Sequence, residues 1–159
     1  MTNERIKRFI ELALAQSGKP YSVHYNSADW YLDKGLKAPH AHLWDFDSNP
    51  KQFDCSGLVA WLKGVALNIR FPHGTKDQQK VCRPLGVEPI EPCDLGFFER
   101  PNSKRHVIIH LHDGYCIEAS GSKGRVVVSD IVSRGLDKTF LGWFRVDGGK
   151  LSKWRRGIL

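Results

Sequence analysis

The sequence predicts an α+β fold, in which helices from the N-terminal half pack on one face of an antiparallel sheet from the C-terminal half. Up to about residue 81, apolar residues recur at helical spacing. After Pro92 the pattern changes to short runs that alternate like strands and are separated by turn residues. Helices that precede the strands, rather than alternating with them, favour separate layers. The 159 residues suffice for a single core, so we expect one domain over residues 1–159.

The helical pattern divides into three predicted helices. The first follows Thr2 or Asn3, either of which can cap it, and ends at the Ser17–Pro20 turn. The second covers Phe53–Leu67 and has a buried apolar stripe, and the third is a short helix over Thr75–Val81. An antiparallel sheet of about five strands is predicted after them: Asp94–Glu99, His106–Leu111, Tyr115–Ser120, Arg125–Ser129 and Phe140–Val146.

Between the first two helices, residues 22–52 form a segment that interrupts the helical pattern. It contains Pro39 and Pro50 together with many aromatic residues, and it is too apolar for a disordered linker. We therefore expect an ordered, loop-rich insertion with a short helix around Ser27–Lys34. The tryptophans Trp30 and Trp44 are expected to pack there, with a role in walling a cleft or recognising a ligand as the alternative.

The net charge of +7 favours an anionic partner. The basic residues are scattered, apart from a short C-terminal cluster, and form no nucleic-acid motif, so nucleic acid is not expected as a partner. No apolar run approaches the roughly 18 residues of a membrane span, so no transmembrane segment is expected. Residues 1–20 carry charges throughout and do not resemble the apolar core of a signal peptide. The oligomeric state has no signature in the sequence.

The spacing of cysteine and histidine does not indicate a metal site. The four cysteines include no Cys-x-x-Cys pair. The two His-x-His pairs, His40/His42 and His110/His112, match no common zinc pattern. We therefore expect neither a metal nor another cofactor.

Cys55 lies within KQFDCSGLVAWLKG, at the predicted start of the second helix. A helix N-terminus stabilises a thiolate, because its unpaired N–H groups and its dipole favour an anion. A nucleophilic cysteine also needs a histidine base and a third group that orients the histidine. Cys55 is therefore either an inert buried thiol, which is the common case, or a nucleophile whose partners come from elsewhere in the chain.

The strand pattern around His106 supplies candidate partners. A two-residue Asp-Gly turn after this strand would place Glu118 on the face opposite to His106. A three-residue loop with Gly114 in the left-handed conformation instead pairs Ile108 with Glu118, and Glu118 then lies on the His106 face, roughly 7–8 Å away along the diagonal. The apolar pattern favours the longer loop. Either residue alone is well explained as a surface strand residue, but with a cysteine at a helix start they form a candidate catalytic site.

These residues resemble the motifs of the NlpC/P60 family, which are papain-like cysteine peptidases of bacterial cell-wall metabolism. Phe53–Val59 matches the family's F-D-C-S-G-L-V nucleophile motif at every position. Gly18–Tyr21 resembles G-x-P-Y, and Pro92–Phe98 resembles P-G-D-L-x-F-F. His106-Val107 matches the start of H-V-G-I, and Ile117–Ser120 stands where the family has I-H-A-S. The resemblance implies a papain-like fold with the nucleophile helix packed on the sheet.

The resemblance also implies roles for individual residues. Cys55 would attack the scissile carbonyl, His106 would act as base and then as acid, and the third catalytic position falls on Glu118. The Cys55 backbone N–H and the Tyr21 hydroxyl are implied to hold the oxyanion. Two residues that flank the cysteine are implied to bind a free N-terminal amine of the substrate: Asp54 and Ser56, with support of the first helical turn as the alternative for Ser56.

Three features depart from the family pattern. The third catalytic position is usually His, sometimes Asn or Gln, and here it is Glu118. Ile108 replaces a glycine on the histidine strand, and the segment between Tyr21 and Cys55 is longer than in compact members. Substrate specificity therefore does not transfer with the motifs.

The implied function is hydrolysis of amide bonds in peptidoglycan stem peptides, commonly between γ-D-glutamate and the diamino acid. The expected partner is accordingly bacterial peptidoglycan or its stem-peptide fragments. An N-acetylmuramoyl-L-alanine amidase, or another thiol amidase or acyltransferase, is the enzymatic alternative. A catalytically degenerate binding or assembly module is the alternative of another class. Without a signal peptide, we expect synthesis in the cytoplasm and a substrate in the cell envelope, reached with a phage or by a non-standard delivery route.

Overall fold

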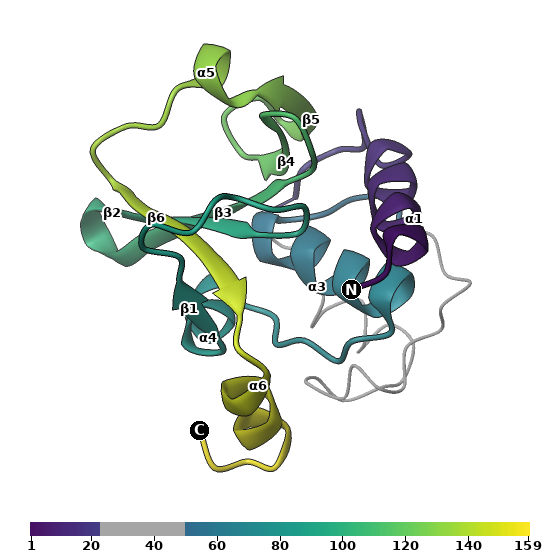
Figure 1. Cartoon of the computed structure of the whole chain (residues 1–159). Helices are drawn as coiled ribbons and strands as arrows, with labels where there is room; N and C mark the ends of the chain where they lie inside the picture. The colour runs from purple at the N-terminus through teal and green to yellow at the C-terminus, as the bar shows by residue number, and fades with distance from the viewer. Residues whose placement is uncertain (23–49) are drawn as a thin grey trace.

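The computed structural model describes residues 1–22 and 50–159 as a layer of helices packed on an antiparallel sheet (Figure 1). The helices are α1 (Asn3–Leu14), α3 (Cys55–Leu67), α4 (Thr75–Lys80), α5 (Ile131–Arg134) and α6 (Gly148–Arg155). The strands are β1 (Cys82–Pro84), β2 (Leu95–Arg100), β3 (Lys104–His110), β4 (Tyr115–Ser120), β5 (Arg125–Asp130) and β6 (Phe140–Val146). They form a six-stranded sheet in the order β1-β6-β2-β3-β4-β5. In Figure 1, α1 and α3 lie together on one side of the sheet, and α5 and α6 lie at opposite ends of the molecule.

The predicted α+β class is confirmed, and each predicted helix and strand in the described residues is present, with bounds that differ by at most two residues. The sheet has six strands instead of the five predicted, and the additional strand is β1. This strand has three residues and ends at Pro84, and it pairs with β6 at the edge of the sheet, where a missing N–H is tolerated. Two helices were also missed. α5 is a single turn, and α6 begins with Gly148 and Gly149, which have low helix propensity.

The predictions for residues 23–49 lie outside the described residues. They include the short helix around Ser27–Lys34, the packing of Trp30 and Trp44, and the His40/His42 pair. The described ends of the segment lie side by side, because the Phe53 N–H donates to the Pro20 carbonyl and the Ser22 N–H donates to the Phe53 carbonyl, both at 3.1 Å. This pairing brings Tyr21 next to the start of α3.

The main core lies between the helices and the sheet. α3 is buried from Ser56 to Leu67, since α1 covers one of its sides and the sheet covers the other. Each large aliphatic side chain buried in this way contributes about 1.5–3 kcal/mol to the free energy of folding. The fully buried side chains of this core include Phe9, Leu58, Leu62, Leu95, Phe97, Ile109 and Ile117. The nucleophile helix is therefore among the most firmly packed elements of the molecule.

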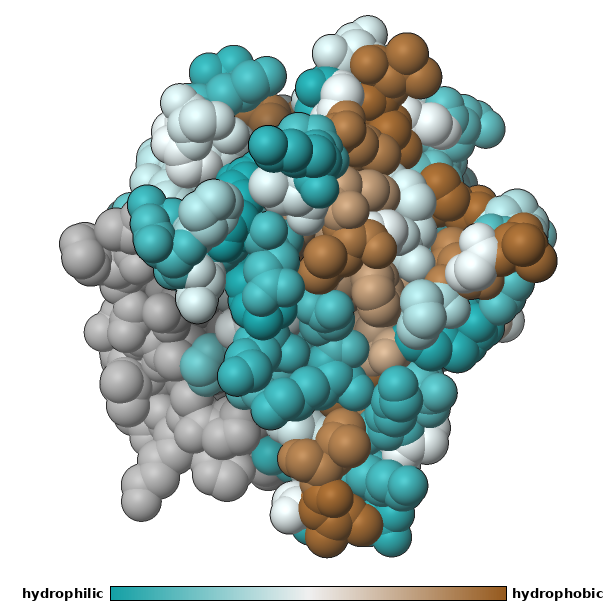
Figure 2. Space-filling model, turned by 90° about the vertical axis from the view of Figure 1, so that its left-hand side faces the viewer, coloured by the Kyte–Doolittle hydropathy of each residue, from teal (hydrophilic) through white to brown (hydrophobic). Residues whose placement is uncertain are grey.

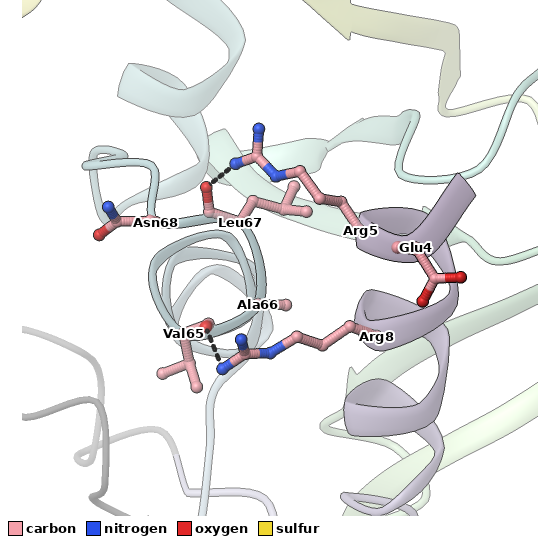
Figure 3. A pocket seen from close by; sticks show the side chains of 7 residues that line it. All are labelled: Glu4, Arg5, Arg8, Val65, Ala66, Leu67 and Asn68. Carbon is pink, nitrogen blue, oxygen red and sulfur yellow. Dashed lines mark hydrogen bonds between the residues drawn. The ribbon is translucent and has the colours of Figure 1, made fainter. Parts of the chain in front are cut away.

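Two arginines of α1 hold the C-terminal end of α3 (Figure 3). The Arg5 guanidinium donates to the Leu67 carbonyl, and the Arg8 guanidinium donates to the Val65 carbonyl at 3.5 Å. Carbonyls in the last turn of a helix lack partners within the helix, and cations near them also favour the helix dipole. These contacts fix the orientation of α3 relative to α1, and therefore the position of Cys55 at its other end.

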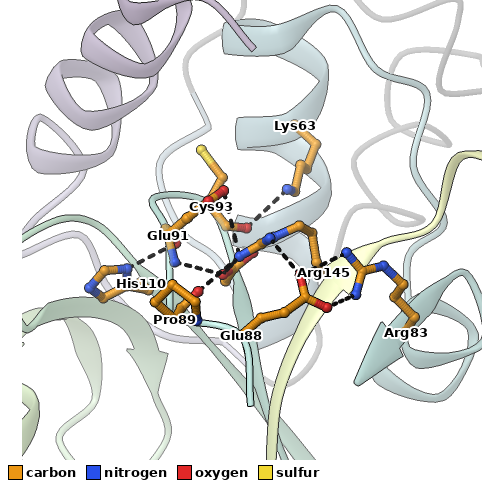
Figure 4. A network of polar contacts seen from close by, with 9 residues as sticks. Lys63, Arg83, Glu88, Pro89, Glu91, Cys93, His110 and Arg145 are labelled. Carbon is orange, nitrogen blue, oxygen red and sulfur yellow. Dashed lines mark hydrogen bonds and ion pairs between the residues drawn. The ribbon is translucent and has the colours of Figure 1, made fainter. Parts of the chain in front are cut away.

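A polar network fixes the loop that leads into β2 (Figure 4). The Arg145 guanidinium of β6 donates two hydrogen bonds to the Asp94 carboxylate, each 2.8 Å long. Asp94 also accepts the Glu91 N–H at 2.7 Å, and the ring of His110 on β3 contacts the Glu91 carbonyl at 2.9 Å. Buried Lys63 of α3 donates to the Cys93 carbonyl at 3.1 Å. The network joins α3, β3 and β6 to the loop that precedes β2.

The opposite face of the sheet carries a smaller cluster of buried side chains. Phe98, Ile108 and Cys116 form its centre, and Phe140 and Trp143 pack against it. The face of the molecule shown in Figure 2 has a band of apolar surface between hydrophilic areas. Side chains alternate along a strand. A residue two positions before or after Phe98, Ile108 or Cys116 on the same strand therefore points to the same side of the sheet as this cluster.

Candidate active site

Cys55 is the first residue of α3, and Asp54 is its N-cap. The Asp54 carboxylate accepts the Gly57 N–H at 2.7 Å, a bond that starts the helix at the cysteine. Cys55 is half-buried, and its Sγ lies 3.8 Å from the Thr75 Oγ1 of α4. The thiol therefore meets the unpaired N–H groups of a long, buried helix, where an anion is favoured.

The first turn of α3 is held against α4 by Gln78. Its buried side-chain amide donates to the Ser56 carbonyl and to the Pro72 carbonyl, both at 2.9 Å. These two hydrogen bonds fix α4 beside the cysteine and bring Thr75 into contact with the thiol.

The register of β3 and β4 places Glu118 on the same face as His106. Ile109 pairs with Ile117, and the Leu111 N–H donates to the Tyr115 carbonyl at 2.9 Å. The loop between them has Asp113 and Gly114 at φ 49° and 79°. The predicted three-residue loop is therefore confirmed, and the two-residue turn is excluded.

His106 and Glu118 are hydrogen-bonded and buried. The Nε2 atom of His106 lies 2.8 Å from Oε1 of Glu118, and the residues are 7% and 5% exposed. Burial alone would lower the pKa of His106, but hydrogen bonds to Cys55 and to Glu118 outweigh it and raise the pKa above its ordinary value of 6.5. Nε2 faces Glu118, so the other ring nitrogen, Nδ1, is available to Cys55. The structure thus brings together the three residues predicted from the sequence: Cys55, His106 and Glu118.

Arg134 is a site residue that the sequence analysis missed. Its guanidinium donates two hydrogen bonds to the Glu118 carboxylate, one from Nε to Oε2 and one from Nη2 to Oε1 at 2.9 Å. Burial would raise the pKa of Glu118, but Arg134 and His106 hold it at about 2. The sequence did contain a signal, because a buried carboxylate needs a cation, but Arg134 lies in a one-turn helix without a helical pattern of its own.

Tyr21 lies close to the candidate nucleophile. Burial raises the pKa of its hydroxyl, and the negative charges of Cys55 and Asp54 raise it further. Its backbone N–H donates to the Gly124 carbonyl at 2.9 Å. A Cβ on Gly121 would meet its ring at 3.4 Å, an ordinary van der Waals distance, so the ring lies directly beside Gly121. The hydroxyl is thereby held near the N-terminus of α3.

The two residues predicted to bind a substrate amine lie on either side of Cys55 and differ in exposure. Asp54 is partly exposed while its carboxylate caps the helix. Ser56 is buried, and its carbonyl is bonded to Gln78. This burial favours the alternative for Ser56, which is support of the first helical turn, over contact with substrate.

A pocket lies at the start of α4, and one of its lining residues contacts the candidate nucleophile. Its lining includes Thr75, which contacts the Cys55 thiol, and two cationic side chains, Lys76 and Arg105. Arg105 is held by Glu99 at 2.9 Å. The complete lining is Gly74, Thr75, Lys76, Asp77, Ser103 and Arg105. The lining therefore brings two cations and one carboxylate, Asp77, near the Thr75 side chain that contacts the thiol.

Within residues 1–22 and 50–159, no group of three or more His, Cys, Asp or Glu side chains is arranged to hold a metal ion. His110, one of the considered ligands, is engaged with the Glu91 carbonyl instead. Among the same residues, no helix has the length and apolar character needed to cross a membrane.

The fold and the site define a papain-like α+β protein, with a cysteine at a helix N-terminus and a histidine and a carboxylate on adjacent strands. The model of the NlpC/P60 family matches residues 42–145, and the chain belongs to this family. Both the family and the papain-like fold were predicted from the sequence, and both are confirmed.

Two relatives and one solved structure illustrate the match. The chain is 33% identical to the peptidoglycan endopeptidase RipB of Mycobacterium tuberculosis, over 84% of this chain and 51% of RipB. It is 28% identical to the gamma-DL-glutamyl hydrolase of Bacillus subtilis, over 61% of this chain and 24% of that protein. The solved structure of RipB matches with a TM-score of 0.59 at 28% identity, over 90% of this chain and 65% of that chain. The chain spans about half the length of RipB.

Proposed function

We propose that the chain is a cysteine peptidase that hydrolyses amide bonds in peptidoglycan stem peptides, at the bond between γ-D-glutamate and the diamino acid. The proposal rests on a chain of side-chain contacts. It leads from Cys55, at the helix N-terminus, through His106 to ionised Glu118. A thiol at a helix start, next to an imidazole with a raised pKa, has the surroundings of an activated nucleophile.

The substrate class is supported by three further observations. RipB is named a peptidoglycan endopeptidase, and the Bacillus subtilis relative is named a gamma-DL-glutamyl hydrolase. The pocket lined by Thr75, which contacts the Cys55 thiol, contains Lys76 and Arg105, and these cations suit the free carboxylates of a stem peptide. The net charge of +7 also favours approach to an anionic cell envelope.

The reaction proceeds in two stages. In the first, the Cys55 thiolate bonds to the scissile carbonyl carbon, and the Cys55 backbone N–H and the Tyr21 hydroxyl donate to the oxyanion. The His106 imidazolium then gives a proton to the amine nitrogen as the C–N bond breaks, which leaves a thioester on Cys55. In the second stage, His106 takes a proton from water, the hydroxide attacks the thioester, and the carboxylic acid product and the thiol are released. Ionised Glu118 stabilises the imidazolium throughout.

Digestion of purified peptidoglycan by the wild type and by Cys55→Ala, with mass spectrometry of the soluble fragments, tests the proposal. Fragments cut between D-glutamate and the diamino acid, absent with the variant, are expected. Release of whole stem peptides would instead indicate an N-acetylmuramoyl-L-alanine amidase. A protein that binds peptidoglycan without releasing fragments, and whose Cys55 resists alkylation, would be a binding module.

A further inference from the structure

Glu118 is held by two side chains from different elements. His106 of β3 and Arg134 of α5 both contact Oε1, at 2.8 and 2.9 Å, and Arg134 also donates to Oε2. The two Arg134 bonds form a bidentate pair, which fixes both the position of a carboxylate and the direction of its oxygens. With Arg134 in this position, Oε1 is turned toward the imidazole.

Arg134 is itself held in place by its short helix and by an aromatic ring. Asp130 caps α5 by accepting the Val132 N–H at 2.8 Å. The chain leaves α5 at Gly135, which has φ 75°, and the Arg134 guanidinium donates to the Gly135 carbonyl at 2.7 Å. The guanidinium lies over the ring of Phe98, 5.0 Å from its centroid. The Arg134 side chain is 16% exposed, so water screens its charge only partly.

The charges around this pair come from several elements. Cys116 lies close to both Glu118 and Arg134, and burial raises the pKa of its thiol to about 11, so it is neutral at ordinary pH. Arg134 is the cation that is bonded to Glu118 throughout the pH range, because His106 carries its charge only when protonated. The other groups that act on the pair or its neighbours are Cys55, Asp130, Asp137 and Arg100.

We propose that Arg134 is a positioning residue of this site, whose bidentate pair with Glu118 turns that carboxylate toward His106 and thereby sets the pH range in which Cys55 is reactive. The inference rests on the proposed pairing of Cys55 with His106, but not on peptidoglycan as the substrate. The side-chain partner of Arg134 in this arrangement is Glu118, and Arg134 acts through it.

The sign of the effect follows from the charges. Without Arg134, a buried carboxylate has one charged partner instead of two, so it accepts a proton at higher pH and then no longer stabilises the imidazolium. Loss of a nearby positive charge also makes proton release from the imidazolium less favourable. A plot of Cys55 reactivity against pH has an acid limb, where reactivity rises, and a basic limb, where the imidazolium loses its proton. Both limbs therefore move to higher pH when the positive charge of Arg134 is removed.

Alkylation of Cys55 by iodoacetamide, followed by mass spectrometry of the Cys55 peptide from pH 3 to 10, tests this without any substrate. In Arg134→Met and Arg134→Gln, the acid limb is expected to move up by about one pH unit or more. Arg134→Lys keeps the charge but not the bidentate geometry. Its acid limb is therefore expected at a pH between the acid limbs of the wild type and of Arg134→Met. In a Glu118→Gln background, Arg134→Met is expected to move the limb much less, because it acts through the carboxylate.

Arg100→Met is the matched control. Arg100 also lies over the Phe98 ring, 5.3 Å from its centroid, but it belongs to β2 and acts on Asp137, not on Glu118. Its removal should therefore move the profile much less than removal of Arg134 does. Circular dichroism verifies that each variant is folded. An Arg134→Met or Arg134→Gln profile that coincides with the wild type would overturn the inference, and so would an equal shift in Arg100→Met. Failure to cut peptidoglycan together with the expected shift would refute only the proposed substrate.

Discussion

The Nε2 atom of His106 lies 2.8 Å from Oε1 of Glu118, although the two residues are diagonal and not directly opposite on their strands. Ile108, not His106, stands opposite Glu118 when the observed register is extended by one pair, and the longer reach of a glutamate side chain closes the diagonal. An aspartate at the same place would fall short by one methylene group. The length of the Glu118 side chain therefore matches the distance to His106 that the strand register sets.

Glu118→Gln is expected to lower kcat/KM by about 100-fold or more while the protein stays folded. The amide keeps the shape but removes the anion that raises the pKa of His106. The imidazolium then loses its proton at lower pH, so the basic limb of the pH profile moves down, opposite to the shift expected for Arg134→Met. Steady-state rates on a purified muropeptide across the pH range measure this. An unchanged basic limb would show that Glu118 does not support the imidazolium.

The same carboxylate predicts how stability depends on pH. The pKa of Glu118 is lowered from 4.5 to about 2 by folding, so its contribution to stability is present above about 4.5 and is lost as the pH falls toward 2. Urea unfolding of the wild type at pH 7 and at pH 3 should show the lower free energy of unfolding at pH 3. Glu118→Gln should be less stable at pH 7, because Arg134 is left without its anion, but its stability should change less over this interval. Equal changes in both proteins would contradict the assignment.

The sequence was sufficient to predict the helix that begins at the cysteine and the face on which His106 and Glu118 meet. Both depend on local signals: an apolar stripe at helical spacing that follows Phe53, and a left-handed glycine that selects the loop length. Arg134 and β1 were not predictable in this way. Arg134 reaches Glu118 across 16 positions, and β1 pairs with β6 far along the chain, so each depends on tertiary packing and not on a local pattern.

Tyr21→Phe is expected to lower kcat by about 100-fold with little change in KM, because a lost oxyanion donor weakens the transition state more than the bound substrate. The ring would still pack beside Gly121, so the thermal midpoint of unfolding should be close to that of the wild type. Alkylation of Cys55 should be little affected, which separates loss of the donor from loss of the nucleophile. An unchanged kcat would mean that the Tyr21 hydroxyl is not an oxyanion donor.

Lys76→Glu is expected to raise KM several-fold and to leave Cys55 alkylation unchanged. The pocket that contains Lys76 is lined by Thr75, which contacts the thiol, and reversing one of its cations would repel a substrate carboxylate. The effect should shrink at high salt, because screening weakens interactions between exposed charges. Lys153→Glu is the control, since Lys153 is an exposed lysine of α6 and makes the same change in net charge. Equal effects of the two variants would assign the change to overall charge and not to the pocket.

Asp54 combines two roles that substitutions can separate. Its carboxylate accepts the Gly57 N–H at 2.7 Å, so Asp54→Ala should lose about 1 kcal/mol of stability through the missing cap. Asn caps helices nearly as well as Asp, so Asp54→Asn should keep most of that stability. The asparagine lacks the charge that would attract a free amine. The KM of the Asp54→Asn variant should therefore rise for stem peptides with a free N-terminal alanine but not for the same peptides with a blocked N-terminus. Urea unfolding and paired kinetics on the free and acetylated peptides measure the two effects. An equal rise in KM for both peptides would mean that Asp54 acts on the substrate only by holding the start of α3.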